Sequence, residues 1–277
     1  MARPNLSYLK NLILFLLGIP LGIVAGLTAM AASVFAVPVV RPLLGLRAGR
    51  AAGIGLAATF FAALAALLSY GLSGRILWGL ALVLAVFQVV GAAWGERLAL
   101  RFPALNRLPW LWGTLIVLGG AAMAAQALGY WGGPVSLSHA VVKPVWLYLL
   151  ALPVGFAVGV VSRVFSLGGV LLVPAAIYAL GLPPQVAQGT ALVVLVVASL
   201  PGMLLRAQRG EVEAQGATWL SGGAVLGGLG GALFAVGRSM TEAHTLLVFG
   251  VVLTLVGLFM LWRPAPLPEK EQTPEAE

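Results

Sequence analysis

The chain has 277 residues, of which 61% are hydrophobic and only 9% are charged. Soluble proteins carry about 25% charged residues, so this composition excludes an ordinary soluble domain and indicates a protein that crosses a membrane several times. The formal net charge is +8, but the basic residues lie in short segments beside apolar stretches, and no nucleic-acid motif accompanies them. We therefore expect the lipid bilayer, and not nucleic acid, as their partner.

The apolar stretches are of two kinds. Two long ones, 11–44 and 145–182, are interrupted near the middle by Gly, Pro, Ser or Thr, which predicts a broken helix or a re-entrant hairpin in each. The others are close to the roughly 20 residues that cross about 30 Å of hydrocarbon. We predict them to be transmembrane helices, at 51–70, 76–96, 109–130, 186–205, 213–236 and 243–262.

The two halves of the chain resemble each other. The segment IPLGIVAG at 19–26 is similar to LPVGFAVG at 152–159 with an offset of 133 residues, and Pro38 then matches Pro174 with an offset of 136. Because the N-terminal segment is part of this duplication, we expect it to belong to the fold. We prefer this interpretation to a cleaved secretory signal, which a basic N-terminus followed by an apolar run also resembles.

The duplication predicts the organisation of the chain into two repeats. We expect an N-terminal repeat at 1–130, a connecting loop at 131–144, a C-terminal repeat at 145–263 and a disordered Pro- and Glu-rich tail at 264–277. Each repeat consists of one broken hairpin and three transmembrane helices.

The basic residues favour one topology over the other. If both broken segments crossed the membrane, the basic residues would divide almost evenly between its two sides and would indicate no orientation. If both are re-entrant, one side holds twelve basic residues and the other only Arg75, Lys143 and Arg238. This split agrees with the positive-inside tendency. It predicts two inverted repeats in the cell inner membrane, with both termini in the cytoplasm.

The sixteenth basic residue, Arg163, lies at the predicted tip of the second hairpin. A lone arginine in the membrane costs about 2.5–3.5 kcal/mol unless it has partners or water, and no acidic residue occurs in this hairpin. Two explanations stay open. Arg163 either braces the broken helix by bonding its free carbonyl groups, or attracts an anion together with the N–H groups that a broken helix exposes.

The two hairpin tips, Thr28 to Ser33 and Ser162 to Gly169, are expected to meet near the membrane centre. Hydroxyl, amide and backbone N–H donors at these tips and in the helix that follows the second hairpin are the candidate anion ligands. They are Arg163, Ser162, Ser166, Gly168 and Gly169 in the second tip, Thr28 and Ser33 in the first, and Gln188 and Thr190 in the following helix.

The acidic residues and the absence of cysteine limit the chemistry. The chain has no Cys and no Asp, and every Glu before the tail is placed at the end of a predicted segment, as Glu96 is. No carboxylate proton relay is therefore expected. No His lies near Ser162 or Ser166 to activate a hydroxyl nucleophile. We predict a protein that is not an enzyme and that has no catalytic residue, metal or cofactor.

Three segments of the second half resemble the TauE/SafE family of sulfite and organosulfur anion transporters. They are GVVSRVFSLGGVLLVP at 159–174, LGLPPQVAQGTAL at 180–192 and RGEVE at 209–213. In that family a glycine-rich G-x-G-G-G turn precedes an apolar run ending in Pro, and a segment G-x-x-x-x-x-A-x-G-T opens the next helix. The residues that match this second segment are Gly181, Ala187, Gly189 and Thr190.

The resemblance implies transport of a small sulfur-containing anion, with the substrate site between two inverted halves. The tips depart from the family pattern. The turn at 165–169 keeps two of the four glycines, and the first half has AMAAS at 29–33 instead. The alternatives are an anion permease for another substrate, working like a channel, or an inactive membrane scaffold. An intramembrane enzyme is the least favoured, and the oligomeric state stays open.

Overall fold

The computed structural model describes residues 4–46, 48–102, 109–130, 144–164, 170–237 and 240–262. Within these ranges the protein is all-helical. The helices of the first half are α1 (Pro4–Thr28), α2 (Ser33–Leu44), α3 (Ala48–Leu72), α4 (Trp78–Arg101) and α5 (Pro109–Ala127). Those of the second half are α6 (Pro144–Val164), α7 (Leu172–Tyr178), α8 (Pro184–Gln208), α9 (Ala214–Val236) and α10 (Glu242–Trp262).

In the described part of the chain, 8 helices are long and apolar enough to cross a membrane, judged by length and composition. The exceptions are α2, with 12 residues, and α7, with 7 residues. The predicted class, an all-helical protein with several membrane-spanning helices, is confirmed. One boundary differs from the prediction in a way that matters, because α4 continues to Arg101 and Glu96 therefore lies inside the helix and not at its end.

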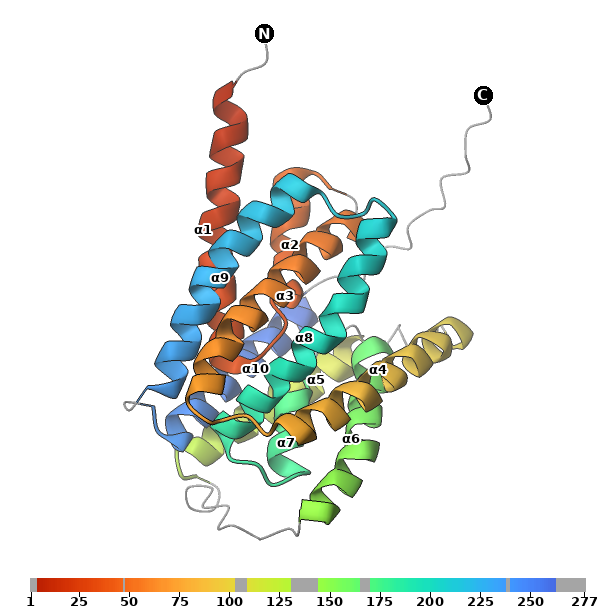
Figure 1. Ribbon diagram of the computed structural model, residues 1–277, viewed down its shortest axis with the longest axis vertical. Coiled ribbons are helices and arrows are strands. Elements are labelled where there is room, and N and C mark those ends of the chain that lie inside the picture. Colours follow the sequence, from red (N-terminus) through yellow and green to blue (C-terminus); the bar gives the residue numbers. More distant parts are fainter. Residues whose placement is uncertain are drawn as a thin grey trace.

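The first predicted interruption is a break in the structure, and the second falls largely on residues 165–169, which lie outside the described ranges. The first separates α1, which ends at Thr28, from α2, which begins at Ser33. The second lies between Val164 at the end of α6 and Leu172 at the start of α7. In Figure 1, α1 enters from the upper end of the molecule and α2 turns back toward that end, whereas α6 starts at the lower end. The re-entrant hairpins stay a prediction, since α1 and α6 are both among the helices long enough to cross a membrane.

Close helix packing gives the relative direction of α1 and α9. A Cβ atom added at Gly18 would lie 2.3 Å from the carbonyl oxygen of Leu220, and one added at Gly26 would lie 2.3 Å from that of Gly228. The contacts advance along both helices in the same order, so α1 and α9 run parallel. Only glycine permits such approach of two backbones, which explains the small-residue spacing in both segments.

The same contact recurs between α6 and α4. A Cβ atom at Gly155 would lie 3.0 Å from the carbonyl oxygen of Leu84, and one at Gly159 would lie 2.2 Å from that of Gln88. These two helices are therefore also parallel to each other. The first helix of each half packs in this way against the fourth helix of the other half. Two related repeats that pack symmetrically on each other would make the same pair of contacts.

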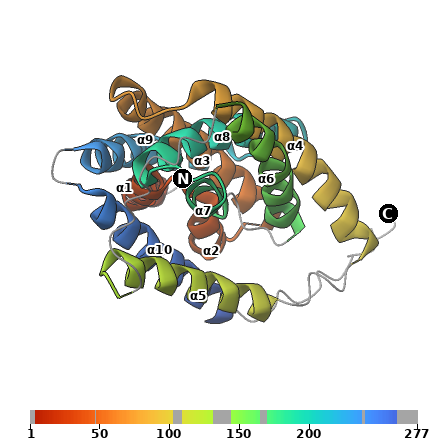
Figure 2. The same ribbon diagram turned by 90° about the horizontal axis from the view of Figure 1, so that it is seen from below.

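Helices α3 and α8 are antiparallel. Arg206, near the end of α8, bonds to Gly49 at the start of α3, while Thr190, near the start of α8, bonds to Leu77 just beyond the end of α3. Figure 2 shows the short helices α2 and α7 inside a ring of the longer helices, with α5 and α10 side by side on one edge. These directions and positions support the predicted inverted repeats, whose boundaries stay a prediction.

The packing also corrects the sequence alignment of the repeats. With the offset of 136 that relates Gln88 in α4 to Ala224 in α9, the contact of Gly22 with Ala224 is equivalent to that of Gly159 with Gln88. This pairing gives an offset of 137 between α1 and α6, so the predicted offset of 133 is wrong by one helical turn. Glycines repeat every four residues in both helices, which lets the sequences match equally well after a shift of one turn.

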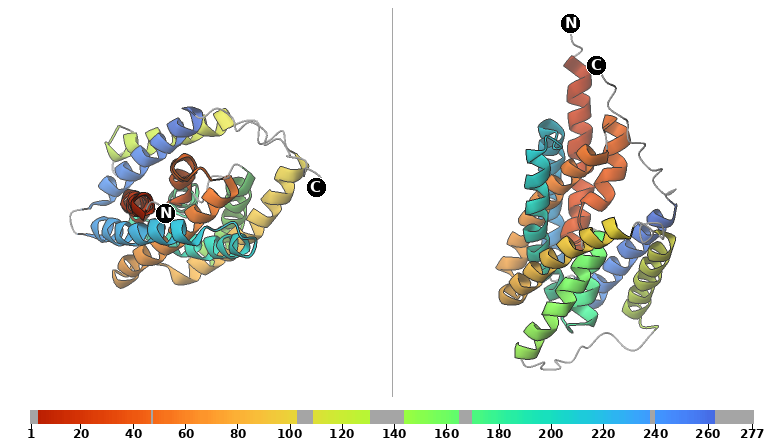
Figure 3. Two further views of the ribbon diagram at one scale, coloured as in Figure 1. Left: turned by 90° about the horizontal axis from the view of Figure 1, so that it is seen from above. Right: turned by 90° about the vertical axis from the view of Figure 1, so that its right-hand side faces the viewer.

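Buried residues beside the two breaks belong to one apolar cluster. It includes Ala29, Met30 and Ala31 of the first break together with Val170 and Leu172 beyond the second. The right-hand view of Figure 3 shows the molecule from the side, with α4 and α6 in its lower part, below the upper ends of α8 and α9. The expected approach of the two tips stays a prediction, because residues 165–169 lie outside the described ranges.

Candidate functional site

The first break is closed by the side chain of Thr28. Its hydroxyl donates to the carbonyl oxygen of Val24 at 2.6 Å and accepts from the backbone N–H of Met30 at 3.3 Å. Ala29 has a φ angle of 54°, a left-handed conformation that costs a non-glycine residue roughly 1–2 kcal/mol. Thr28 was predicted as an anion ligand, but in this structure its only hydroxyl proton is used to hold the break.

The second helix of this hairpin is anchored through Ser33. The backbone N–H of Ser33 donates to Oγ1 of Thr59 at 2.9 Å, and the Thr59 hydroxyl donates to the carbonyl oxygen of Gly55 at 2.8 Å. Thr59 is fully buried in α3. One of the N–H groups that a helix start leaves unpaired is therefore satisfied by a neighbouring helix, and the Ser33 side chain is left for other contacts.

Tyr70 connects the first break to the helix that follows the second one. Its hydroxyl lies 2.9 Å from Oε1 of Gln188 and 3.3 Å from the carbonyl oxygen of Gly26, close to the end of α1. The sequence interpretation missed Tyr70. A single tyrosine near the end of an apolar segment is typical of an interfacial anchor, so no sequence signal distinguished it, although the side chain is fully buried.

The amide nitrogen of Gln188 is an unused donor group. Its Oε1 accepts from Tyr70, whereas Nε2 has no hydrogen-bond partner among the described residues. The residue is 1% exposed. Leaving a buried donor unpaired costs about 1–3 kcal/mol, so a ligand oxygen at this position would remove an existing penalty. Among the predicted ligands, Gln188 is the one whose geometry fits that role best.

Two other predicted ligands, Thr190 and Ser162, differ in whether their hydroxyl oxygens have a hydrogen-bond partner. Oγ1 of Thr190 accepts from the backbone N–H of Leu77 at 3.3 Å, which ties the start of α4 to α8. Thr190 is therefore engaged within the protein. Oγ of Ser162 is buried and has no partner among the described residues. The remaining candidates, Ser166, Gly168 and Gly169, lie outside the described ranges.

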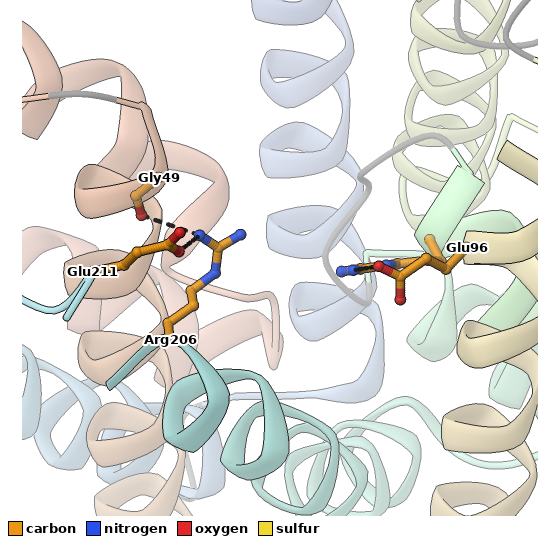
Figure 4. Close-up of polar contacts among 5 residues, drawn as sticks. Gly49, Glu96, Arg206 and Glu211 are labelled. Atoms are coloured by element: carbon orange, nitrogen blue, oxygen red, sulfur yellow. Dashed lines mark hydrogen bonds and ion pairs between the residues drawn. The ribbon is translucent and has the colours of Figure 1, made fainter. Parts of the chain in front are cut away.

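Arg163 has an acidic partner. Its Nη2 lies 2.8 Å from Oε1 of Glu96, which projects from α4 (Figure 4). The expectation of an arginine without a carboxylate partner is wrong. The cause is the longer α4, which carries Glu96 along α6 to the level of the break. The two side chains are 50% and 56% exposed, so the pair lies on a surface and not in a packed core.

Two polar clusters close opposite ends of the α3 and α8 pair. At one end, Nη1 of Arg206 donates to Oε2 of Glu211 at 3.0 Å and to the carbonyl oxygen of Gly49 at 3.1 Å (Figure 4). At the other end, Arg75 donates to Oε1 of Gln185. Residues 75 and 211, and residues 49 and 185, are related by the offset of 136 found in the sequence.

The second of these clusters extends across the end of the molecule. Nε2 of Gln185 lies 3.1 Å from the carbonyl oxygen of Ala235 at the end of α9, and 2.9 Å from that of Met240. It also lies 3.4 Å from Oγ1 of Thr245 in α10. One glutamine thereby links the starts of α8 and α10 to the end of α9.

Two hollows on the helix bundle have apolar linings. One lies between α1 and α9, beside Ile23 and Phe234, and the other lies between α5, α7 and α10, beside Trp112 and Tyr178. Neither hollow is lined by Gln188. The unpaired Gln188 amide is enclosed by packed helices in this structure.

The broken helices, membrane-length helices and buried unpaired donors define a class, the multi-pass membrane proteins with interrupted helices. The family model described as sulfite exporter TauE/SafE matches residues 2–143 and 150–276, so the chain belongs to this family.

Relatives in two bacteria are similar over different lengths. A probable membrane transporter protein of Xylella fastidiosa strain 9a5c is 27% identical over 250 residues, covering 90% of this chain and 92% of the relative. The corresponding protein of strain Temecula1 gives the same values. The probable membrane transporter protein YunE of Bacillus subtilis strain 168 is 30% identical over 114 residues, or 41% of each chain. No solved structure matches the chain significantly.

Proposed function

We propose that this protein transports a small sulfur-containing anion, such as sulfite or a sulfonate, across the cell inner membrane. The observation that carries the proposal is the unpaired Nε2 of Gln188, buried beside the first helix break. An amide N–H is a hydrogen-bond donor of the kind that an oxyanion accepts. Membership of the TauE/SafE family supports the substrate class.

The proposed site lies between the two breaks. Gln188 and Ser162 supply unpaired donors, and Arg163 supplies positive charge at the second break. Thr28, Thr190 and the backbone N–H of Ser33 hold the surrounding helices through bonds already made. The three predicted ligands between residues 165 and 169 complete the proposal, with Gly168 and Gly169 allowing a ligand to approach the backbone.

We expect the transporter to work by alternating access between its two halves. The first helix of each half packs on the fourth helix of the other, and the polar clusters around Arg75 and Arg206 close opposite ends of α3 and α8. Breaking one cluster while the other holds would expose the site to one side at a time. Both termini lie in the cytoplasm in this proposal, because that orientation places most basic residues there. Catalysis has no part in it.

Flux of radiolabelled sulfite into proteoliposomes tests the proposal, with sulfate and taurine as comparison substrates. We expect sulfite flux above that of protein-free liposomes and strong loss of that flux in Gln188→Leu. A matched control is Gln126→Leu, because Gln126 also accepts from a tyrosine, Tyr178, but lies outside the proposed site. Absence of flux for every sulfur oxyanion would leave an inactive scaffold, and equal flux of chloride would indicate an unselective anion channel.

A further inference from the structure

Equivalent helices of the two halves are packed differently. With the offset of 136 residues, α4 corresponds to α9 and α8 corresponds to α3. The contact of α4 with α8 should therefore match the contact of α9 with α3. Helices α9 and α3 remain side by side, whereas α4 diverges from α8 toward its end (Figures 1 and 3).

Burial along α4 shows where the two helices separate. Gln88 is buried, and so is its counterpart in α9. One turn farther, Gly228 of α9 is buried, whereas its counterpart Ala92 is half-buried. After another turn, Ala232 of α9 is fully buried, whereas its counterpart Glu96 has a side chain that is 56% exposed. The face of α4 that should contact α8 is therefore uncovered beyond Gln88.

The end of α8 is uncovered in the same way. Ala62 of α3 is fully buried, but its counterpart Ala198 is half-buried. Ser69 of α3 is 4% exposed, but its counterpart Leu205 is 48% exposed. The cluster around Arg206 joins α8 to α3 and leaves this side of α8 free. Both partners of the α4 and α8 contact are thus uncovered over the same part of their lengths.

Helix α6 is separated from α8 together with α4. Its counterpart α1 packs against α3 and α10 as well as against α9. Within the described ranges, no comparable packing joins α6 to α8 or to α5. The contact of α6 with α4 is nevertheless tight, because a Cβ atom added at Gly95 would lie 2.6 Å from the carbonyl oxygen of Val160. Helices α4 and α6 therefore form one unit.

This unit stays attached to α8 at the start of α4. The backbone N–H of Leu77 donates to Oγ1 of Thr190 at 3.3 Å, and a Cβ atom at Gly189 would lie 2.2 Å from the carbonyl oxygen of Arg75. The other half has the equivalent contact, because a Cβ atom at Gly53 would lie 2.6 Å from the carbonyl oxygen of Glu211. A contact that both halves keep is suited to be the pivot of a rotation.

Charged side chains lie on the separated face. Glu96 takes the place of Ala232, and Arg163 takes the place of Gly26, by the offsets of 136 and 137 found above. Both of these counterparts are buried, whereas the side chains of the ion pair are 50% and 56% exposed. Exposed charges within a membrane protein face water far more readily than lipid. The pair therefore indicates that water, and not lipid, covers this face.

We infer that this structure is open between α4 and α8, toward the end that holds Arg206, and that the opposite state closes Ala92 onto Ala198. Helices α4 and α6 move as one unit, as in the rocking of one repeat on the other. In the proposed orientation the open end faces the cytoplasm. The inference goes beyond the proposed function, because it names the moving helices and does not depend on which solute is carried.

The other half gives the geometry of the closed contact. A Cβ atom added at Gly228 would lie 3.2 Å from Cα of Ala62. These residues are the counterparts of Ala92 and Ala198. A disulfide needs Cα atoms no more than about 7 Å apart, so cysteines at Ala92 and Ala198 can be joined in the closed state, whereas the separated helices of the open state prevent it.

Single cysteines at matched positions test the open state. The probe is a charged, hydrophilic maleimide present on both sides of proteoliposomes, so the result does not depend on orientation. We expect Ala198→Cys to react at least about tenfold faster than Ala62→Cys, because a buried position reacts only after a local opening. Leu64→Cys is the control for lipid exposure, since Leu64 is 42% exposed on the outer side of α3 and should react slowly. Equal rates at Ala198 and Ala62, or no reaction at Ala198, overturn the inference.

The pair of cysteines at Ala92 and Ala198 tests the closed state. A mild oxidant should form the disulfide and cause loss of sulfite flux, and a reductant should restore the flux. The matched control is Ala93→Cys with Ala198→Cys, because Ala93 is exposed on another face of α4 and should give no disulfide. No disulfide at Ala92, an equal yield in the control, or a disulfide that leaves flux unchanged overturns the movement.

Failure of this inference and failure of the proposed function are distinguishable. The labelling rates and the disulfide yield are measured without substrate, so they decide the inference even if the parent protein carries no sulfur anion. If the double variant does not fold, the two single-cysteine rates decide. Sulfite flux in the parent together with equal labelling of Ala198→Cys and Ala62→Cys leaves the proposed function standing and removes the open state described here.

Discussion

The hydroxyl of Tyr70 donates a hydrogen bond of 2.9 Å to Oε1 of Gln188, although the two residues are 118 positions apart in the chain. In this arrangement the glutamine amide has its Oε1 on the tyrosine hydroxyl and its Nε2 turned away from it. Nε2 is thereby presented as the free donor. Tyr70 is a positioning residue in this account, and it also contacts the end of α1 through Gly26.

Removing the Tyr70 hydroxyl should weaken substrate binding. In Tyr70→Phe the amide of Gln188 is free to turn, so we expect KM for sulfite to rise about fivefold, as for the loss of about 1 kcal/mol, with kcat within about twofold of the parent. Tyr178→Phe is the control, because this phenol donates to another glutamine, Gln126, at 2.8 Å. Equal KM values in the two variants would remove the positioning role.

Helix packing at Gly159 should be sensitive to a single methyl group. A Cβ atom there would lie 2.2 Å from the carbonyl oxygen of Gln88, so Gly159→Ala should destabilise the protein by about 1–3 kcal/mol through overpacking. The control is Gly119→Ala in α5, where an added Cβ atom meets nothing within 4 Å. Melting temperatures in one detergent compare the two variants, and a Gly159→Ala protein as stable as the control would contradict this packing.

The topology is tested with single cysteines in this cysteine-free chain. Cysteines at Arg101 and Arg209 should react with an impermeant maleimide only from the cytoplasmic side, and a cysteine at Arg75 only from outside. The physical reason is that the first two lie at the ends of α4 and α8, opposite to the turn that holds Arg75. Labelling of Arg75 and Arg209 from the same side would exclude the inverted arrangement.

The positions of the breaks could be predicted from the sequence, whereas the relative register of the repeats could not. Gly, Thr and Ser interrupt two otherwise apolar segments, and backbone groups freed in a membrane must find partners, so the interruption at Thr28 to Ser33 was visible locally. The alignment of α1 with α6 depends on which glycine of each helix meets which carbonyl group of its partner helix. Glycines such as Gly18 and Gly22, spaced by four residues, leave a one-turn ambiguity that only packing resolves.

The candidate site could be predicted only in part, because the sequence shows local features but not the partners that tertiary structure brings to them. Gln188 was identified because it begins the helix after the second hairpin, and its unpaired donor agrees with that choice. The partners were not identified. Tyr70 and Glu96 belong to other helices, and their contacts with Gln188 and Arg163 depend on tertiary structure. The predicted end of α4 at residue 96 also hid a carboxylate that lies inside the helix.

The central claim is that both helix breaks contribute to one anion site, and substrate protection tests it most directly. Single cysteines at Ser33 and Ser162 are labelled with a small maleimide in the presence and absence of methanesulfonate, which does not react with thiols. A third cysteine at Thr218, an exposed position on α9, is the control. The account predicts that methanesulfonate slows labelling at Ser33 and at Ser162 over the same concentration range and leaves Thr218 unaffected. Protection at only one break, or at neither, while sulfur anions are still transported, would contradict the shared site.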